Sequence, residues 1–340
     1  MIQKPKYCCW VLTYKCMFEC QMCRIWNINF DDHNETLLAD KKKFVTGLAD
    51  FVDENFEFHL SGGEPLLSDD LIPLLRHINK HRFRTNLVTN GWLVDDYMLQ
   101  QLQDAGLSSL TFSLDGMNAA THDFLRGVKG SFQRIMSAIE MAERIKSDLD
   151  LSIITLINGY NLDEVLALTD WVEHHPILKM ISFQVVTQPF SDDRNDRWFE
   201  EEQNKFLWPQ DLEKTAKIFE QLKSLRENGA KIGNNANQFD AFKNYFKDPN
   251  KFLKKVRCSM GDYEFHIDPF GKMFFCNNTE PIGNITKDNL PDVWKDDKTQ
   301  KTRDKVYKCK DNCHIMVNCF YEDENYKGGF LNRLLRFMGK

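Results

Sequence analysis

The chain has 340 residues, 42% of them hydrophobic and 28% charged, which is ordinary for a globular protein with room for one large and one small domain. A net charge of −6 gives no support to a nucleic-acid-binding role. No apolar run approaches the roughly 20 residues of a membrane-spanning helix, and the N-terminus lacks a secretory signal, so a cytosolic (cytoplasmic) protein is expected.

Six strand-like segments alternate with helix-like segments between about residue 7 and residue 187. They are short, rich in β-branched and aromatic residues, and followed by turn residues. They span Tyr7–Thr13, Phe56–Ser61, Arg84–Thr89, Ser109–Leu114, Asp150–Ile157 and Met180–Thr187. Because parallel neighbours need a crossover helix, six βα units predict a parallel sheet. Six are too few for a closed eight-stranded barrel, so we expect an open, partial barrel over residues 1–190.

Two segments between these strands show helical periodicity. The first is expected to have Ser68 as its N-cap, with Asp69 and Asp70 in its first turn. Its apolar face consists of Leu71, Leu74, Leu75 and Ile78. The second begins at Ser131, and its apolar positions are Phe132, Ile135, Ile139, Ala142 and Ile145.

The remainder of the chain is expected to form three further parts. Residues 191–250 are predicted to be a connecting helical segment, with helices at Pro209–Asn228 and Phe239–Phe246. Its first stretch, Ser191–Asn204, is dense in charge and is interpreted as a surface connection. Residues 251–325 are predicted to form a small cysteine-containing domain. The basic, amphipathic tail at 326–340 is expected to pack on its own domain rather than contact a membrane or a partner.

Ten cysteines fall into two groups, near the start and near the end of the chain. Since cytosolic thiols stay reduced, close cysteine spacing indicates metal binding rather than disulfides. Cys8 and Cys9 are adjacent on the first strand and therefore point to opposite faces. We interpret both as buried core thiols.

The spacing Cys16-x3-Cys20-x2-Cys23 lies in the loop after the first strand. Three thiolates suit an iron–sulfur cluster that keeps one iron open for a bidentate small molecule. A structural zinc ion would need a fourth ligand, for which His33 is the nearest candidate. The spacing alone favours iron–sulfur over zinc.

Polar clusters follow each later strand, at the C-terminal ends where barrel active sites are built. They are Gly62-Gly63-Glu64, Thr89-Asn90-Gly91, Ser113-Leu114-Asp115-Gly116, the group Asn158, Gly159 and Asn161, and finally Gln184 and Gln188. Glycines let a backbone approach a ligand closely, and a glutamate such as Glu64 can accept a hydrogen bond from an ammonium group.

Taken together, the cysteine loop and the Gly62-Gly63-Glu64 segment resemble the signature of the radical S-adenosylmethionine (SAM) superfamily. The resemblance covers most of residues 7 to 190. It implies a partial (β/α)6 TIM-like barrel, a [4Fe–4S] cluster on Cys16, Cys20 and Cys23, and SAM on the open iron. In that family SAM is cleaved reductively to a 5′-deoxyadenosyl radical, which abstracts hydrogen from an unactivated C–H bond. A flavodoxin- or ferredoxin-type protein would be the electron donor.

The resemblance also carries roles to individual residues. Gly62, Gly63 and Glu64 would hold the SAM amino group. The residues carried over to other parts of SAM are Ser113 and Asp115 for the ribose or carboxylate, Arg126 for the carboxylate, and also Asn90 and Asn161. Met22 is a departure, because the residue before the third cysteine is often aromatic and packs near the adenine. A thioether can still pack on a purine.

The second cysteine group surrounds a predicted hairpin at Tyr263–Phe275. This arrangement resembles the auxiliary-cluster domains called SPASM, or their shorter twitch form. The full SPASM pattern has seven cysteines and two clusters, and the five here imply one auxiliary [4Fe–4S] cluster. Its ligands would be Cys258, Cys276 and two of Cys309, Cys313 and Cys319. The spare cysteine is interpreted as a buried hydrophobe rather than a hydrogen-atom donor, and a structural zinc is the alternative for the whole domain.

Three functions remain open at this stage. Because the first strand begins near residue 7, there is no room for the N-terminal leader-binding domain of many peptide-modifying relatives. This favours a small-molecule substrate such as a sugar or cofactor precursor, with the auxiliary cluster as electron acceptor or substrate ligand. A peptide maturase is the first alternative. A non-catalytic iron–sulfur carrier or sensor is the second, against which the Gly62-Gly63-Glu64 segment and the open iron position argue.

Overall fold

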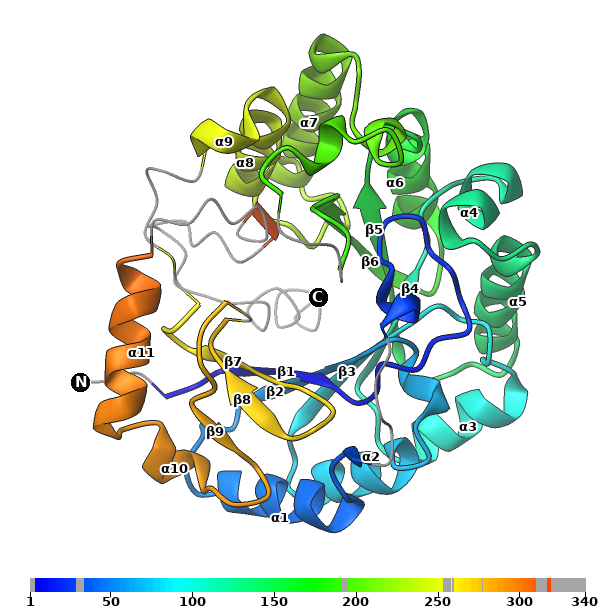
Figure 1. The fold of residues 1–340 in the computed structure, drawn as a ribbon. Helices are drawn as coiled ribbons and strands as arrows, with labels where there is room; N and C mark the ends of the chain where they lie inside the picture. The colour runs from blue at the N-terminus through cyan, green and yellow to red at the C-terminus, as the bar shows by residue number, and fades with distance from the viewer. Residues whose placement is uncertain are drawn as a thin grey trace.

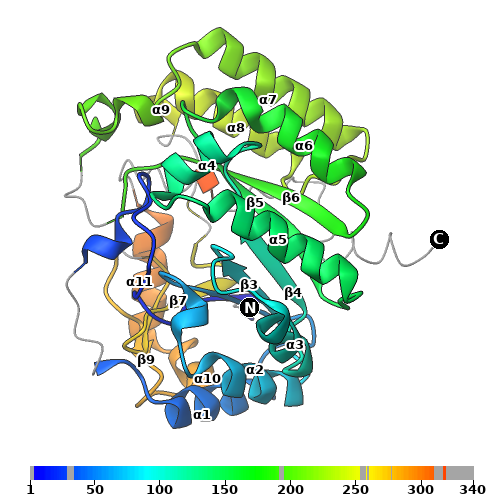
Figure 2. The ribbon, with the colours of Figure 1, turned by 90° about the vertical axis from the view of Figure 1, so that its right-hand side faces the viewer.

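The architecture is one curved nine-stranded sheet with helices around its outer side, as the computed structural model shows (Figures 1 and 2). The strand order is β6-β5-β4-β3-β2-β1-β7-β8-β9. The structure describes residues 4–28, 34–190, 195–252, 258, 260–276, 278–309 and 317–318.

Strands β1 to β6 form the parallel part of the sheet, in sequence order. Their bounds are Tyr7–Val11, Glu57–Ser61, Arg84–Thr89, Ser109–Ser113, Asp150–Ile157 and Leu178–Val185. All six predicted strands are confirmed within two residues at each end. The partial barrel predicted from six βα units is therefore the observed fold class, an α/β fold.

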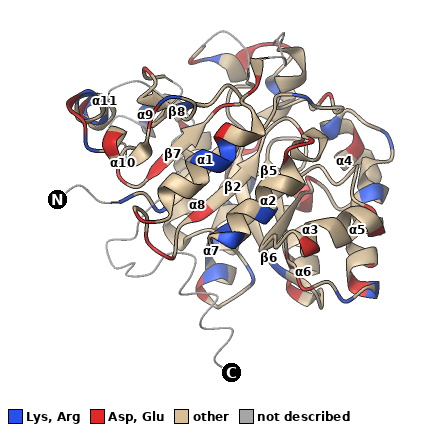
Figure 3. Cartoon of the chain, turned by 90° about the horizontal axis from the view of Figure 1, so that it is seen from below, with Lys and Arg blue, Asp and Glu red and all other residues tan. Residues whose placement is uncertain are grey.

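Most of the crossover helices lie outside the sheet (Figure 1). They are α1 (Leu38–Leu48), α2 (Leu71–Lys80), α3 (Asp96–Asp104), α4 (Ala119–Arg126), α5 (Ser131–Arg144) and α6 (Val165–His174). Short 3₁₀ turns occur at Ile25–Asn27, Pro65–Leu67, Leu162–Glu164, Trp198–Glu200 and Lys205–Leu207. Positively and negatively charged residues are interspersed along the outer helices seen from below (Figure 3).

The predicted apolar face of α2 is confirmed, because Leu71, Leu74, Leu75 and Ile78 are all buried. The predicted N-cap is wrong. Asp70 occupies that position, while Ser68 ends the turn Pro65–Leu67 by donating its N–H to the carbonyl of Pro65. Proline starts this extra turn, so the helix begins two residues later than the spacing of polar residues indicated. In α5, the expected apolar position Ile145 follows the last turn and is 37% exposed.

The connecting segment contributes α7 (Leu212–Glu227), α8 (Ala236–Lys247) and α9 (Pro249–Phe252). Its first stretch is not simply a surface connection, which corrects the prediction for 191–204. Trp198 is fully buried and packs against Trp208 with ring centroids 5.8 Å apart. Asn204 is also fully buried and accepts a hydrogen bond from Arg24 in the N-terminal cysteine loop. Aromatic burial overrides the high local charge.

The predicted hairpin is confirmed as β7 (Glu264–Ile267) and β8 (Lys272–Phe274), followed by β9 (Gly283–Asn284), α10 (Leu290–Val293) and α11 (Asp297–Tyr307). Its position was not foreseen. Strand β7 pairs in parallel with β1, so the C-terminal part extends the barrel sheet directly. The predicted tail at 326–340 lies outside the described residues.

Alternate residues of β1 face opposite sides of the sheet. Cys8 and Trp10 are buried toward the outer helices, where the Trp10 ring contacts Phe44 of α1. Tyr7 and Cys9 therefore face the inner side of the curved sheet. Among the described residues, no helix is long and apolar enough to cross a membrane.

Candidate active site

The loop that follows β1 carries Cys16, Cys20 and Cys23, which influence one another electrostatically. Cys20 is 7% exposed, and the other two are half-buried. The loop is fixed against α4, because the N–H of Gln21 donates to the carbonyl of Leu125 at 2.9 Å. This places the three thiols beside the C-terminal ends of the parallel strands.

The spacing of these thiols fits a cluster better than a single ion. A tetrahedral zinc ion with Zn–S bonds of about 2.3 Å would bring its sulfur ligands to about 3.8 Å from one another. In the described part of the chain, Cys16, Cys20 and Cys23 do not form a group with all ligand atoms within 4.8 Å. The three sulfurs are thus near one another but too widely spread for one zinc ion. The larger [4Fe–4S] unit, which thiolates hold, suits this donor set.

Hydrogen bonds to sulfur support the same assignment, since such bonds tune iron–sulfur clusters. The N–H of Phe18 donates to Cys16 Sγ at 3.4 Å, and a backbone N–H at Ile25 donates to Cys23. Burial raises the pKa of all three thiols, that of Cys20 to about 12. Without a metal ion these thiols keep their protons at neutral pH, so the binding of iron would have to release those protons.

Gly62 and Gly63 lie directly against the cysteine loop. A Cβ atom on Gly62 would sit 2.4 Å from the carbonyl oxygen of Thr13, and one on Gly63 would sit 2.2 Å from that of Lys15. The N–H groups of Gly63 and Glu64 donate to the same two carbonyls, at 2.8 and 2.7 Å. The glycines thus allow two loops of this chain to touch, a role in addition to the expected approach to a ligand.

Glu64 is fully buried, and three donors hold its carboxylate. Oε1 accepts from the N–H of Leu66 and from the hydroxyl of Thr89, and Oε2 accepts from the N–H of Asn90 at 2.8 Å. Burial nevertheless raises the pKa of Glu64 to about 7. A carboxylate has about four acceptor positions, so one position on Oε2 remains for a further donor.

Arg126 lies at the end of α4 and forms an ion pair with the fully buried Asp115 at 2.7 Å. Its guanidinium also hydrogen-bonds to Cys20. Asn161 holds Asp115 in place, because its side-chain amide donates a hydrogen bond to the backbone carbonyl of Asp115 at 2.9 Å. Arg126 therefore offsets negative charge at the cysteine loop, and Asp115 and Asn161 fix its position.

His122 is a member of this network that the sequence reasoning did not select. Its Nδ1 accepts the N–H of Asp115 at 3.1 Å, and the side chain is fully buried. Burial, aided by the charge of Arg126, lowers the pKa of His122 to about 3. The available signal was its position four residues before Arg126, one turn away on the same helix α4.

The low pKa of His122 predicts a pH dependence of stability. In the unfolded chain His122 takes up a proton near pH 6.5, and in the folded chain it does not. The contribution of neutral His122 to the free energy of unfolding is therefore fully present above pH 6.5 and is lost as the pH falls toward 3. Between pH 6.5 and 5.5 the loss is about 1 kcal/mol, or roughly 1–3 °C in melting temperature. His122→Asn keeps an acceptor for Asp115 and should lack this component. Equal melting shifts in the two proteins would contradict the assignment.

The other predicted SAM-site residues lie around the same strand ends. Asn90 donates its side-chain amide to Met17 Sδ in the cysteine loop at 3.4 Å, and Ser113 ends β4. Met22 is 6% exposed and packs in the core. Thr89, which hydrogen-bonds to Glu64, belongs to the group although it was not selected as a site residue.

The second cysteine group is described only in part. Cys276 follows β8, and its Sγ accepts the N–H of Asn278 at 3.4 Å. Cys258 is half-buried and Cys309 is exposed. Cys313 and Cys319 lie outside the described residues, as does His33. The ligand set of an auxiliary cluster therefore stays a prediction.

Comparisons with known families agree with this geometry. The Radical SAM superfamily matches residues 10–172, which include the cysteine loop and strands β2 to β5. The SPASM family, an iron-sulfur cluster-binding domain, matches residues 258–320. The chain belongs to the radical SAM superfamily. It is an enzyme that contains a SPASM domain. Its cofactors are SAM, the [4Fe–4S] cluster that binds SAM, and auxiliary iron–sulfur clusters.

Among curated relatives, the AdoMet-dependent heme synthase of Methanosarcina barkeri is 25% identical over 87% of this chain and 83% of its own length. The GTP 3′,8-cyclase of Picosynechococcus is 35% identical, over 43% of each chain. The solved structure of Streptococcus suis SuiB bound to the precursor peptide SuiA has a TM-score of 0.63 at 16% identity, and it covers 98% of this chain and 73% of that chain. This last likeness shows the fold alone.

Proposed function

We propose that Cys16, Cys20 and Cys23 hold the SAM-binding cluster and that residues 62–64 position SAM beside it. The observation that carries this proposal is the direct hydrogen bonding of Gly63 and Glu64 to the carbonyls of Thr13 and Lys15. These bonds bring the cysteine loop and the Gly62-Gly63-Glu64 segment into one rigid unit.

Each surrounding side chain has a defined task in this proposal. When bound, the cluster and SAM supply a 5′-deoxyadenosyl radical that abstracts hydrogen from an unactivated C–H bond. Glu64 offers its remaining acceptor position on Oε2 to the SAM amino group. Arg126 provides positive charge at the cysteine loop, held there by Asp115. Ser113, Asn90, Asn161 and Met22 complete the proposed surroundings of SAM.

The proposed substrate is a small-molecule cofactor precursor. Support comes from the near full-length relative named as a heme synthase and from the relative named as a GTP cyclase, since both names concern small molecules. An auxiliary [4Fe–4S] cluster, held by four of Cys258, Cys276, Cys309, Cys313 and Cys319, would serve as electron acceptor or substrate ligand. A flavodoxin- or ferredoxin-type protein would deliver the first electron.

A peptide substrate is the second candidate. The structure of SuiB, a protein of the same fold, has been solved with its precursor peptide. The structural match to SuiB covers nearly the full length of this chain. The two candidates differ in what should stimulate the reaction, which makes them separable in one assay.

The test uses the holoenzyme, reconstituted without oxygen and reduced with dithionite. We expect about eight irons per chain, as two [4Fe–4S] clusters require. Formation of 5′-deoxyadenosine from SAM is then measured by mass spectrometry with GTP, an iron tetrapyrrole or a mixture of short peptides. A correct small-molecule substrate should increase the rate at least about tenfold, because substrate binding completes the site.

Reactions without dithionite provide the control for non-enzymatic breakdown of SAM. Stimulation by peptides but not by the small molecules would overturn the proposed substrate class and favour the second candidate. Absence of any 5′-deoxyadenosine from fully iron-loaded enzyme with every substrate would contradict the proposed site.

A further inference from the structure

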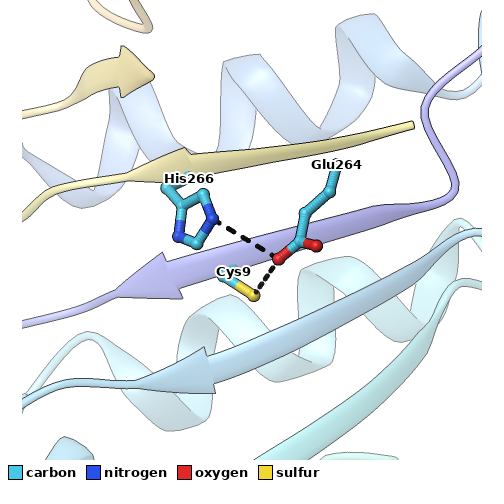
Figure 4. A group of neighbouring side chains, drawn as sticks. All are labelled: Cys9, Glu264 and His266. Carbon is cyan, nitrogen blue, oxygen red and sulfur yellow. Dashed lines mark hydrogen bonds and ion pairs between the residues drawn. The ribbon is translucent and has the colours of Figure 1, made fainter. Parts of the chain in front are cut away.

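A group of metal-ligating side chains lies on the inner side of the sheet, outside the site described above. Cys9 comes from β1, and Glu264 and His266 come from β7 (Figure 4). Their ligand atoms all lie within 4.8 Å of one another, which holds for no other group of three in the described residues. Cys9 was predicted to be a buried core thiol, and this prediction is wrong, because Cys9 is only half-buried and its Sγ contacts the carboxylate of Glu264.

The pairing of the strands creates this group. Cys9 lies opposite His266 on one side and opposite His59 on the other, in the same register across three parallel strands. Residues opposite one another in a parallel sheet point to the same face. Two histidines and a cysteine therefore form a row on the inner face, and Glu264 reaches toward Cys9 and His266.

The distances within the group suit a single metal ion. Both contacts converge on one carboxylate oxygen, Glu264 Oε1, which lies 3.1 Å from Cys9 Sγ and 3.4 Å from His266 Nε2 (Figure 4). Around a tetrahedral zinc ion, with bonds of about 2.0–2.3 Å, ligand atoms lie about 3.3–3.6 Å apart. Small adjustments of these side chains would accommodate the ion.

The chemistry of the donors agrees with the distances. Thiolate, imidazole and carboxylate are the three ligand types of protein zinc sites. The Nε2 atoms of His266 and His59 are both buried, and each has a carboxylate nearby: that of His266 lies 3.4 Å from Glu264 Oε1, and that of His59 lies 3.7 Å from Glu57 Oε2. These distances are longer than those of a strong hydrogen bond, and a metal ion between the side chains would give the buried Nε2 of His266 a closer partner.

We propose that Cys9, Glu264 and His266 bind a divalent transition-metal ion of the zinc class, as a mononuclear site distinct from the iron–sulfur sites. Three protein ligands leave the fourth position open to water or to an oxygen or nitrogen donor of a small molecule, as in catalytic zinc sites. His59 lies opposite Cys9 on β2 and therefore on the same face of the sheet. Cys9 is two residues before the end of β1, so the ion would lie roughly 7 Å along the strand from the start of the cysteine loop.

The test measures zinc in the holoenzyme and does not depend on activity. Protein produced with zinc in the medium is reconstituted with iron, dialysed against zinc-free buffer and analysed for both metals. We expect about one zinc ion per chain, and X-ray absorption at the zinc edge should show one sulfur at about 2.3 Å together with nitrogen or oxygen ligands. Iron content remains that of the clusters.

Two variants remove ligands and one serves as a matched control. Cys9→Ala and His266→Gln should each reduce zinc to near zero while iron content is retained. Cys8→Ala removes the neighbouring thiol on the opposite face and should leave zinc unchanged. Because the two ligand variants alter different strands, a folding failure in one leaves the other informative.

Three outcomes would overturn the proposal. Full zinc content in soluble Cys9→Ala and His266→Gln proteins would place the ion elsewhere. A shell of four sulfurs in the absorption spectrum would assign the zinc to the C-terminal cysteines. Absence of zinc from the unmodified holoenzyme, with added Zn²⁺ failing to bind, would show that the three residues form only a polar cluster.

Discussion

Replacing Cys20 by alanine should abolish 5′-deoxyadenosine formation, with a loss of at least about a thousandfold, because the cofactor carries the difficult chemistry. Cys20 is the most buried of the three loop thiols and lies beside Arg126. With only two thiolates left, the SAM-binding cluster should not persist. Iron should fall from about eight to about four atoms per chain, and mass spectrometry with iron analysis measures both effects.

Cys8→Ala is the matched control for this prediction. Cys8 is also a buried cysteine, but it points toward the outer helices. Its replacement should reduce stability by about 1 kcal/mol, as small core deletions do, and should retain iron and activity. Retained 5′-deoxyadenosine formation in Cys20→Ala would show that Cys20 does not hold the cluster.

The second large effect is expected for Gly63→Ala. The added Cβ would lie 2.2 Å from the carbonyl oxygen of Lys15 and 2.6 Å from that of Tyr14, which is closer than real contacts allow. Both neighbours are backbone atoms of the cysteine loop and cannot rotate away. We expect a loss of about 3 kcal/mol or more and a melting temperature lower by roughly 5–10 °C.

In Gly63→Ala the displaced cysteine loop should also take up less iron. This result would distinguish a role of Gly63 in holding the cysteine loop from a role in contacting SAM alone. If Gly63 contacted only SAM, the variant would keep its iron and its stability and would lose affinity for SAM alone. Gly47→Ala is the control, because a Cβ there meets only Asn289 Oδ1 at an ordinary 3.4 Å. Since Gly47 lies within α1, alanine should leave stability unchanged or increase it by up to about 1 kcal/mol.

Local sequence pattern was enough to locate the barrel strands. Each strand is a short apolar run bounded by turn residues, and its hydrogen-bond partners come from the next βα unit, so pattern and chain order determine the parallel sheet. The N-cap of α2 was misplaced because Pro65 adds a turn before the helix. Trp198 was misassigned because its partner Trp208, which in turn packs against Tyr245 of α8, is not visible in the composition of the charged stretch around Trp198.

The candidate site was predictable where residues act as a contiguous motif. Cys16, Cys20 and Cys23 form one loop and residues 62–64 form another, so each is a short motif that could be selected by its resemblance to a family signature. The contact between these loops depends on backbone geometry that spacing does not encode. The group of Cys9, Glu264 and His266 was not predictable for a similar reason, since it depends on the pairing of β1 with β7 from distant parts of the chain.

That pairing has a consequence for how the protein is made. Strand β1 cannot complete its hydrogen bonds with β7 until about 250 further residues have been synthesised, which takes roughly 10–50 s at ordinary translation rates. The cysteine loop follows directly from this half-paired strand. Loading of iron should therefore follow synthesis of β7, and the cellular machinery that delivers clusters should encounter a sheet in which β1 is paired on both sides.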